Sequence, residues 1–265
     1  MKIIRSILYG GKKVMIPIKD DLQPKKAAYI TWVLLALNAL VFSIQLGLPD
    51  YLLNRLYYLY GIVPSRLVDW QWAYRYGFPD RGLITLITSL FLHGGWLHFL
   101  ANNWTLWLFG DDVEDRIGHL NFALLYFLSG LIAGLTHVAF LADSMIPAIG
   151  ASGAVAGVMG AFLFLYPKAR IHVLVPILFF IDIWKIPAAL YLPLWFLGEL
   201  FSGTVALISP GFSGIAFWAH VGGFLGGALL LTKLLHVKVN PPQSGRRPGI
   251  IHGDGFIIIS PPRQY

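Results

Sequence analysis

Long apolar runs constrain the fold of this chain more than any other feature of its sequence. Six stretches nearly free of charge alternate with polar segments, at about Ala27–Leu46, Trp96–Gly110, Leu120–Leu141, Gly150–Tyr166, Pro187–Leu207 and Phe217–Leu235. A helix that crosses a bilayer needs about 20 mainly apolar residues. Charged residues make up 12% of the chain, whereas soluble domains carry about 25%. The sequence therefore predicts an all-α membrane protein, built as a bundle of six transmembrane helices.

Basic residues gather toward the two ends of the chain, and the net charge is +7. Such residues flank membrane helices on the cytoplasmic side, so we expect both termini there, in a multi-pass protein of a prokaryotic-type cell membrane. We expect a basic cytoplasmic segment at 1–26, a membrane domain at 27–236 and a flexible basic Pro- and Gly-rich tail at 237–265. The GII and FIII segments around HGDG in that tail predict a small hairpin. The bilayer is an expected partner and nucleic acid is not.

Two segments between the apolar runs are expected at the membrane surface. Residues 47–81 are rich in Tyr and Trp, which gather at bilayer interfaces, and predict an interfacial outer loop between the first two helices. Residues 171–186 contain Pro176 and two charged residues, and predict a bent elbow. No small-x-small cleavage site follows Leu46, so we expect the first run to be retained as a span.

Ser152 and His220 each stand among glycines on a separate apolar run, in GASGAVAG and AHVGG. Small residues let membrane helices pack closely, and a packing role is the usual one for a lone serine in such a run. A serine and a histidine on two small-residue helices are also the minimum parts of a nucleophile and its general base. The chain has no cysteine, which excludes thiol catalysis and cysteine-ligated metals.

His98 and Asn102 are four residues apart on the second run, so they share one face of a helix. Both can donate hydrogen bonds to a developing oxyanion, and polar contacts between helices are the alternative. His93 is expected to be structural or interfacial, and Asn103 to serve packing.

The polar residues of the even-numbered runs agree in depth. At ~1.5 Å per residue, Ser152 lies about 24 Å, and His220 and His98 each about 20 Å, from the first charged residue at the cytoplasmic end of their run. All three are expected at a similar level below the outer surface of a core about 30 Å thick.

Two carboxylates, Asp182 and Glu199, belong to the region of the fifth run. Glu199 lies toward the middle of that run, and an intramembrane carboxylate is a candidate functional group. The sequence places neither where it would orient His220, so we predict a Ser–His dyad without a third member.

These motifs resemble the rhomboid family of intramembrane serine proteases. The matching segments are HGGWLHFLAN (His93 to Asn102), VEDRIG (Val113 to Gly118), GASG (Gly150 to Gly153) and AHVGG (Ala219 to Gly223). They fall in the family's order on the second, fourth and sixth spans, and the resemblance covers roughly residues 27–236.

The resemblance implies an endopeptidase that cuts single-span membrane proteins near their transmembrane segments. Ser152 would be the nucleophile and His220 the base, and the oxyanion would be held by His98, Asn102 and the Ser152 backbone N–H. Gly150, Gly153 and Gly223 would support these residues. The family uses no metal or cofactor for this reaction.

The resemblance also implies a path to the site. Substrate would enter between the second and fifth spans, with Trp195 and Phe196 as candidate gate residues. The loop at about Ile208–Ala216 would cap a water-filled cavity. Many relatives carry Trp-Arg shortly before the first motif histidine, where this chain has Ile84 and Thr85, so how the outer loop is anchored is left open.

Two other functions fit parts of the same pattern. A non-proteolytic rhomboid-like protein would bind membrane clients without cutting them. A haem-binding electron carrier would use His98, His137 or His220 as axial ligands. The substrate and the oligomeric state are left open by the sequence.

Overall fold

The computed structural model describes residues 16–177, 180–208 and 216–233. Within them a helix stands at each place predicted for a span: α2 (Tyr29–Leu46), α7 (Trp96–Ile117), α8 (His119–Phe140), α9 (Ser152–Leu165), α10 (Ala188–Ile208) and α11 (Phe217–Lys233). Three described helices are long and apolar enough to cross a membrane: α2, α8 and the Ala188–Leu207 part of α10. The apolar helices α9 and α11 are shorter. The basic tail and its predicted hairpin lie outside the described residues.

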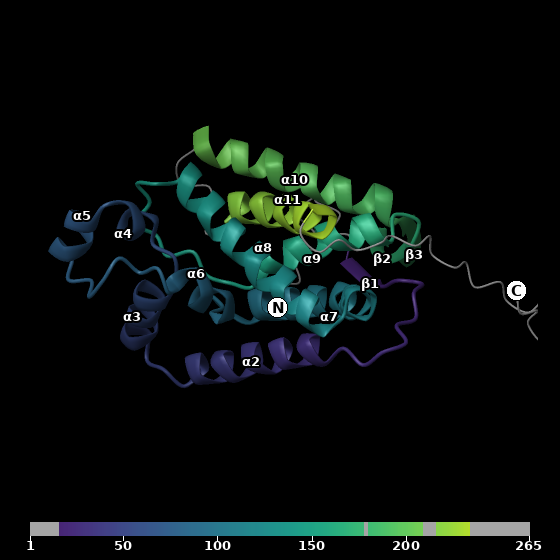
Figure 1. Ribbon diagram of the computed structural model, residues 1–265, viewed down its shortest axis with the longest axis horizontal. Coiled ribbons are helices and arrows are strands. Elements are labelled where there is room, and N and C mark those ends of the chain that lie inside the picture. The colour runs from purple at the N-terminus through teal and green to yellow at the C-terminus, as the bar shows by residue number, and fades with distance from the viewer. Residues whose placement is uncertain (1–15, 178–179, 209–215, 234–265) are drawn as a thin grey trace, which may run out of the picture.

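Helix α9 lies at the centre of the helical body, against α7, α8 and α11. Every residue from Gly153 to Phe162 is buried. Figure 1 shows α10 along the upper edge of the molecule beside α11, and α2 along the lower edge beside α7. A residue at the start of α9 can therefore meet side chains from several helices.

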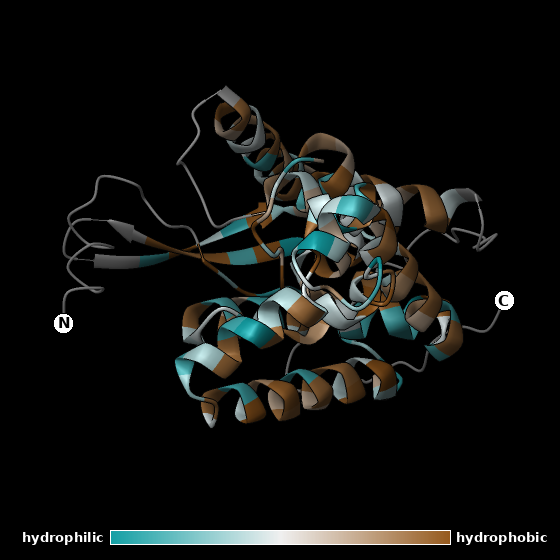
Figure 2. Ribbon diagram, turned by 90° about the vertical axis from the view of Figure 1, so that its left-hand side faces the viewer, coloured by the Kyte–Doolittle hydropathy of each residue, from teal (hydrophilic) through white to brown (hydrophobic). Residues whose placement is uncertain are grey.

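Hydrophobic residues, brown in Figure 2, predominate along the helices, and many of the large ones are exposed. On α10 the exposed ones include Leu190, Leu194, Leu197 and Phe201. A soluble protein rarely exposes so large an apolar surface. Lipid chains would cover it without cost, which agrees with the composition.

The expected outer loop at 47–81 does lie between the first two predicted spans, but it is mainly helical and not irregular; its place at the membrane interface stays a prediction. It forms α3 (Asp50–Tyr60), α4 (Pro64–Val68) and α5 (Trp70–Arg75), followed by α6 (Thr85–Thr88) and the 3-10 helix η1 (Ser89–Phe91). Local chemistry explains the short helices. Proline is tolerated in the first turn of α4, and the Asp69 side chain caps α5 by accepting a hydrogen bond from the Trp72 N–H.

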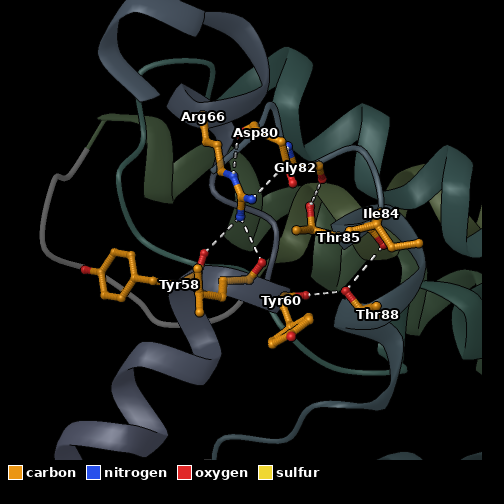
Figure 3. A network of polar contacts seen from close by, with 9 residues as sticks. Tyr58, Tyr60, Arg66, Asp80, Gly82, Ile84, Thr85 and Thr88 are labelled. Carbon is orange, nitrogen blue, oxygen red and sulfur yellow. Dashed lines mark hydrogen bonds and ion pairs between the residues drawn. The ribbon is translucent and has the colours of Figure 1, made fainter. Parts of the chain in front are cut away.

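Arg66 anchors this segment (Figure 3). Its side chain is 2% exposed and forms a 2.8 Å ion pair with Asp80. The guanidinium also donates to the carbonyl oxygens of Tyr58 and Leu59, which end α3. Gly82, at φ +72°, packs directly on the guanidinium where a Cβ would not fit. The chain thus anchors its outer segment from Arg66, although it lacks the Trp-Arg pair.

The expected elbow at 171–186 is a β-hairpin, and that prediction was wrong. Strands β2 (Arg170–Ile177) and β3 (Phe180–Pro187) pair antiparallel, and β1 (Ile16–Lys19) adds a third strand in the order β1-β2-β3. Ile171, Val173 and Val175 are buried on one face, with the period of two that a strand requires. The described residues are therefore mainly helical with one small sheet, which lies at the opposite end of the molecule from α3–α5 (Figure 1).

The acidic segment after the second apolar run forms the last part of α7. Its Glu114 side chain is fully buried and accepts hydrogen bonds from the Ile30 and Thr31 N–H groups and from Thr31 Oγ1, each at 2.8 Å. These N–H groups open α2 and have no partner inside that helix. Glu114 thus caps α2 and ties it to α7.

Candidate active site

Ser152 and His220 meet where α9 and α11 begin. Ser152 is the first residue of α9, and His220 lies in the first turn of α11. The Ser152 hydroxyl donates to His220 Nε2 at 2.7 Å. The His220 side chain is 12% exposed. Sequence predicted a common depth for these residues, and the structure brings their side chains into contact.

Glycines allow this contact because they let the two helices touch along their backbones. A Cβ on Gly223 would overlap the carbonyl oxygen of Gly153, and a Cβ on Gly227 would overlap that of Gly157. On its other side, Gly153 faces α8, where a Cβ would lie 2.5 Å from the Cβ of Ala133. Since real Cβ atoms do not approach other atoms so closely, only glycine fits these positions.

His98 and Asn102 reach from α7 to the backbone just before Ser152. A Cβ on Gly150 would lie 2.5 Å from His98 Nε2 and 3.3 Å from Asn102 Nδ2. Gly150 also has φ +121°, a conformation that side-chain-bearing residues rarely adopt. Both space and backbone geometry therefore require glycine there.

Asn102 presents a free donor at this point. The residue is 6% exposed, and its Nδ2 has no hydrogen-bond partner among the described residues. Buried polar atoms are nearly always paired, so a buried unpaired donor calls for an explanation. The N–H of Ser152, as the first of α9, has no partner within the helix. Asn102 Nδ2, beside Gly150, and the Ser152 N–H, two residues further on, are thus two donors without a partner, and an oxyanion site is built from such donors.

His93 and Asn103 take structural places. The carbonyl oxygen of His93 accepts from Gln45 Nε2 and Tyr57 Oη, and its N–H donates to Gln45 Oε1. Asn103 accepts from Asn38 of α2 at 3.2 Å. These contacts fasten α2 and α3 to α7 and the segment before it.

A small cavity of about 30 Å³ adjoins Ser152. Its lining includes Ser89, Gly130, Gly134, His137, Ile149, Gly153 and Ala219. His137 is 6% exposed, and its Nδ1 has no partner in the described part of the chain. A water needs roughly 10–15 Å³ of such space and two or more polar partners, so this cavity can hold a water close to the nucleophile.

Glu199 lies against His220, and the expectation that no carboxylate is placed to orient this histidine was wrong. Its Oε2 accepts from His220 Nδ1 at 2.6 Å. The position of Glu199 within the fifth apolar run predicts its depth. It does not predict the direction of its side chain, because that depends on how α10 is rotated against α11. The signal that could have found it is the rarity of a carboxylate inside an apolar run.

Trp195 and Phe196 lie on the face of α10 that packs on α11. The Trp195 ring is 6.2 Å from the ring of His220, and the Phe196 ring is 5.0 Å from that of Phe224. Their role as a gate stays a prediction. The predicted cap at 208–216 lies almost wholly outside the described residues. No group of three or more potential metal ligands occurs in the described residues.

Comparison with known proteins identifies the family of the chain. The family model described as "Rhomboid domain" matches residues 80–237. Over 78 residues the chain is 37% identical to "RHOMBOID-like protein 6, mitochondrial" of Arabidopsis thaliana, a match that covers 29% of this chain and 25% of that protein. It is 32% identical over 118 residues to "Putative rhomboid protease YdcA" of Bacillus subtilis, covering 43% of this chain and 58% of that protein.

A third relative bears a different description. "Inactive RHOMBOID-like protein 8" of Arabidopsis thaliana is 37% identical over 78 residues, or 29% of this chain and 22% of that protein. Each match spans less than two thirds of the relative's length. Similarity alone therefore does not separate an active protein from an inactive one, and the chemistry of the site has to decide.

Proposed function

Because this chain belongs to the rhomboid family, we propose that it is an intramembrane serine endopeptidase with Ser152 as nucleophile and His220 as general base. The observation that carries the proposal is the 2.7 Å hydrogen bond from Ser152 Oγ to His220 Nε2. A serine hydroxyl is a weak nucleophile until an adjacent base can take its proton.

The reaction is acyl transfer. His220 takes the Ser152 proton as the hydroxyl attacks the scissile carbonyl carbon, and the carbonyl becomes an oxyanion. His98, Asn102 and the Ser152 backbone N–H hold that oxyanion. His220 then protonates the leaving amine, and a water, deprotonated by His220, hydrolyses the acyl-enzyme. The unpaired Nδ2 of Asn102 supports its role as an oxyanion donor.

The substrates are single-span membrane proteins, cut near their transmembrane segments. The chain would cross the membrane six times, with both termini in the cytoplasm. This arrangement is supported by the helix that stands at each of the six predicted places and by the basic residues near the ends. It would place the site toward the outer face, in contact with water.

The test is to incubate the purified protein in liposomes with a single-span substrate and, separately, with a fluorophosphonate. We expect a cut near the substrate's transmembrane segment, and a covalent adduct that peptide mass spectrometry locates on Ser152. An intact substrate together with an unlabelled serine would overturn the proposal. Substrate capture without cutting or labelling would instead support the non-proteolytic client binder that the named inactive relative suggests.

The haem alternative loses His220, one of its three candidate ligands. Both ring nitrogens of His220 are engaged, one with Ser152 and one with Glu199. An axial ligand needs a free ring nitrogen. A visible spectrum of the purified protein without a haem absorption band is the expected result.

The gate prediction can be tested by locking α10 to α11. A Cβ on Gly203 of α10 would lie 3.2 Å from the Cβ of Phe217 of α11, and disulfide-bonded Cβ atoms are about 3.8 Å apart. The chain has no cysteine, so Gly203→Cys with Phe217→Cys would introduce its only two thiols. If α10 must swing out to admit a substrate helix, the oxidised protein should lose cleavage and regain it on reduction.

Two measurements control that experiment. The oxidised protein should still react with a small fluorophosphonate, because the lock holds the site assembled. Each single-cysteine variant should be insensitive to oxidant. Unchanged cleavage of a single-span substrate by the fully oxidised protein would show that α10 does not act as the gate.

A further inference from the structure

The carboxylate of Glu199 completes a chain of hydrogen bonds that begins at Ser152. Glu199 Oε2 lies 2.6 Å from His220 Nδ1, and His220 Nε2 lies 2.7 Å from Ser152 Oγ. The side chains of Glu199 and His220 are 17% and 12% exposed. In the described part of the chain, His220 is the one hydrogen-bond partner of the Glu199 carboxylate. The two nitrogens of one imidazole thus join a carboxylate to a hydroxyl.

This contact selects the tautomer that a general base needs. An ionised carboxylate only accepts hydrogen bonds, so the neutral His220 ring carries its proton on Nδ1. Nε2 is then unprotonated and can accept the Ser152 proton. In a histidine, the hydrogen bond made by one ring nitrogen decides whether the other ring nitrogen is protonated or free to react.

Helical spacing on both sides of the contact fixes the imidazole ring. Trp195 and Glu199 are four residues apart on α10, and His220 and Phe224 are four apart on α11, so each pair shares a face. The Trp195 ring lies 6.2 Å from the His220 ring and 6.0 Å from the Phe224 ring. The carboxylate therefore holds the edge of the imidazole while Trp195 lies against it.

A purely structural role is the alternative, in which Glu199 and His220 only join α10 to α11. A carboxylate inside an apolar span is costly, and an interhelical hydrogen bond in a membrane protein stabilises the fold only slightly. If the bond only supported packing, it would not offset the cost of placing a carboxylate inside an apolar span. The engagement of the same imidazole with the Ser152 hydroxyl favours a functional role.

We propose that Glu199 is the positioning residue of a Ser152–His220–Glu199 triad, an assignment that rests on the proposed protease function. When Ser152 Oγ bonds to the scissile carbonyl carbon, its proton moves to Nε2 and His220 becomes an imidazolium. The Glu199 carboxylate stabilises that cation and keeps its hold on the Nδ1 proton without taking it. The Nε2 proton then passes to the leaving amine as the peptide bond breaks. His220 returns to the neutral ring with its Nδ1 proton still toward Glu199.

The test compares Glu199→Gln and Glu199→Asp with the wild type, with Gly198→Ala as the control on the same helix. A Cβ on Gly198 meets nothing within 4 Å. Glutamine keeps the size of Glu199 but not its charge, so kcat should fall roughly 10²- to 10⁴-fold with KM unchanged. Aspartate should restore part of that loss, and the control should match the wild type. Fluorophosphonate labelling of Ser152 should slow in parallel with kcat, although thermal unfolding of the variants stays close to that of the wild type.

A spectroscopic measurement covers the case in which Glu199→Gln fails to fold. In the wild type, the proton between His220 Nδ1 and Glu199 should give a strongly deshielded NMR resonance that moves in Glu199→Asp. Wild-type kcat in Glu199→Gln, or no such resonance in the wild type, would overturn the triad. If Glu199→Gln is fully active while Ser152→Ala is inactive, only the triad fails. If Ser152→Ala cleaves, the proposed function fails with it.

Discussion

Replacement of Ser152 by alanine is expected to abolish cleavage while leaving the protein folded. The hydroxyl is the group that would bond to the substrate, and His220 has no other nucleophile to activate. Removing the nucleophile of a serine protease costs about 10⁶-fold in kcat, which places the variant at background. The fold should survive, because the substitution removes one hydrogen bond worth about 1 kcal/mol.

Ser129 offers a matched serine-to-alanine control. It lies on α8, fully buried, with an Oγ that has no partner among the described residues. Removing an unpaired buried hydroxyl is neutral or stabilising. Ser129→Ala should therefore keep wild-type cleavage and labelling. Cleavage of a single-span substrate by Ser152→Ala at the wild-type rate would refute Ser152 as nucleophile.

The helices and the Ser–His pair are predictable because their signals are local. An apolar run long enough to cross a bilayer has few structures open to it other than a helix. The motifs around Ser152 and His220 place both residues beside small ones, and the distance of each from the first charged residue that follows it predicts a common depth.

The contact of Glu199 with His220 is not predictable in the same way. Depth along a helix follows from the sequence, but the direction of a side chain depends on helix rotation, which packing decides. Trp195 and Glu199 contact His220 and Phe224 only because α10 packs on α11 in one particular rotation.

The sheet and the outer segment escape prediction for another reason. The segment 170–187 mixes apolar residues with Pro176 and charged residues, so neither a helical nor a strand period stands out until the hairpin pairs. Arg66 is one of many basic residues in the sequence. Its role follows from the carbonyl groups that the end of α3 leaves free, which is a property of the folded segment.

The largest structural effect is expected from alanine at Gly223. Its Cβ would overlap the carbonyl oxygen of Gly153, and a backbone atom in the first turn of a buried helix cannot rotate away as a side chain could. The helices α9 and α11 must separate instead, and overpacking of this kind costs about 1–3 kcal/mol or more. Because the hydrogen bond between Ser152 and His220 joins the same helices, a displacement of about 1 Å should also cost roughly 10²-fold in kcat.

A series of glycine-to-alanine substitutions with increasing steric overlap separates the effect of the backbone clash from the effect of replacing a glycine in a helix. Gly198→Ala meets nothing within 4 Å and should be neutral or up to about 1 kcal/mol more stable. The nearest atoms to a Cβ on Gly226 of α11 belong to the Ile132 side chain, at 3.0 to 3.2 Å. A shift of a few tenths of an ångström makes room for it, so Gly226→Ala should be intermediate. Thermal unfolding and cleavage should both follow the order Gly198, Gly226, Gly223. A Gly223→Ala protein with wild-type stability and activity would mean that α9 and α11 do not touch along their backbones, and the short distance from Ser152 to His220 would then need another explanation.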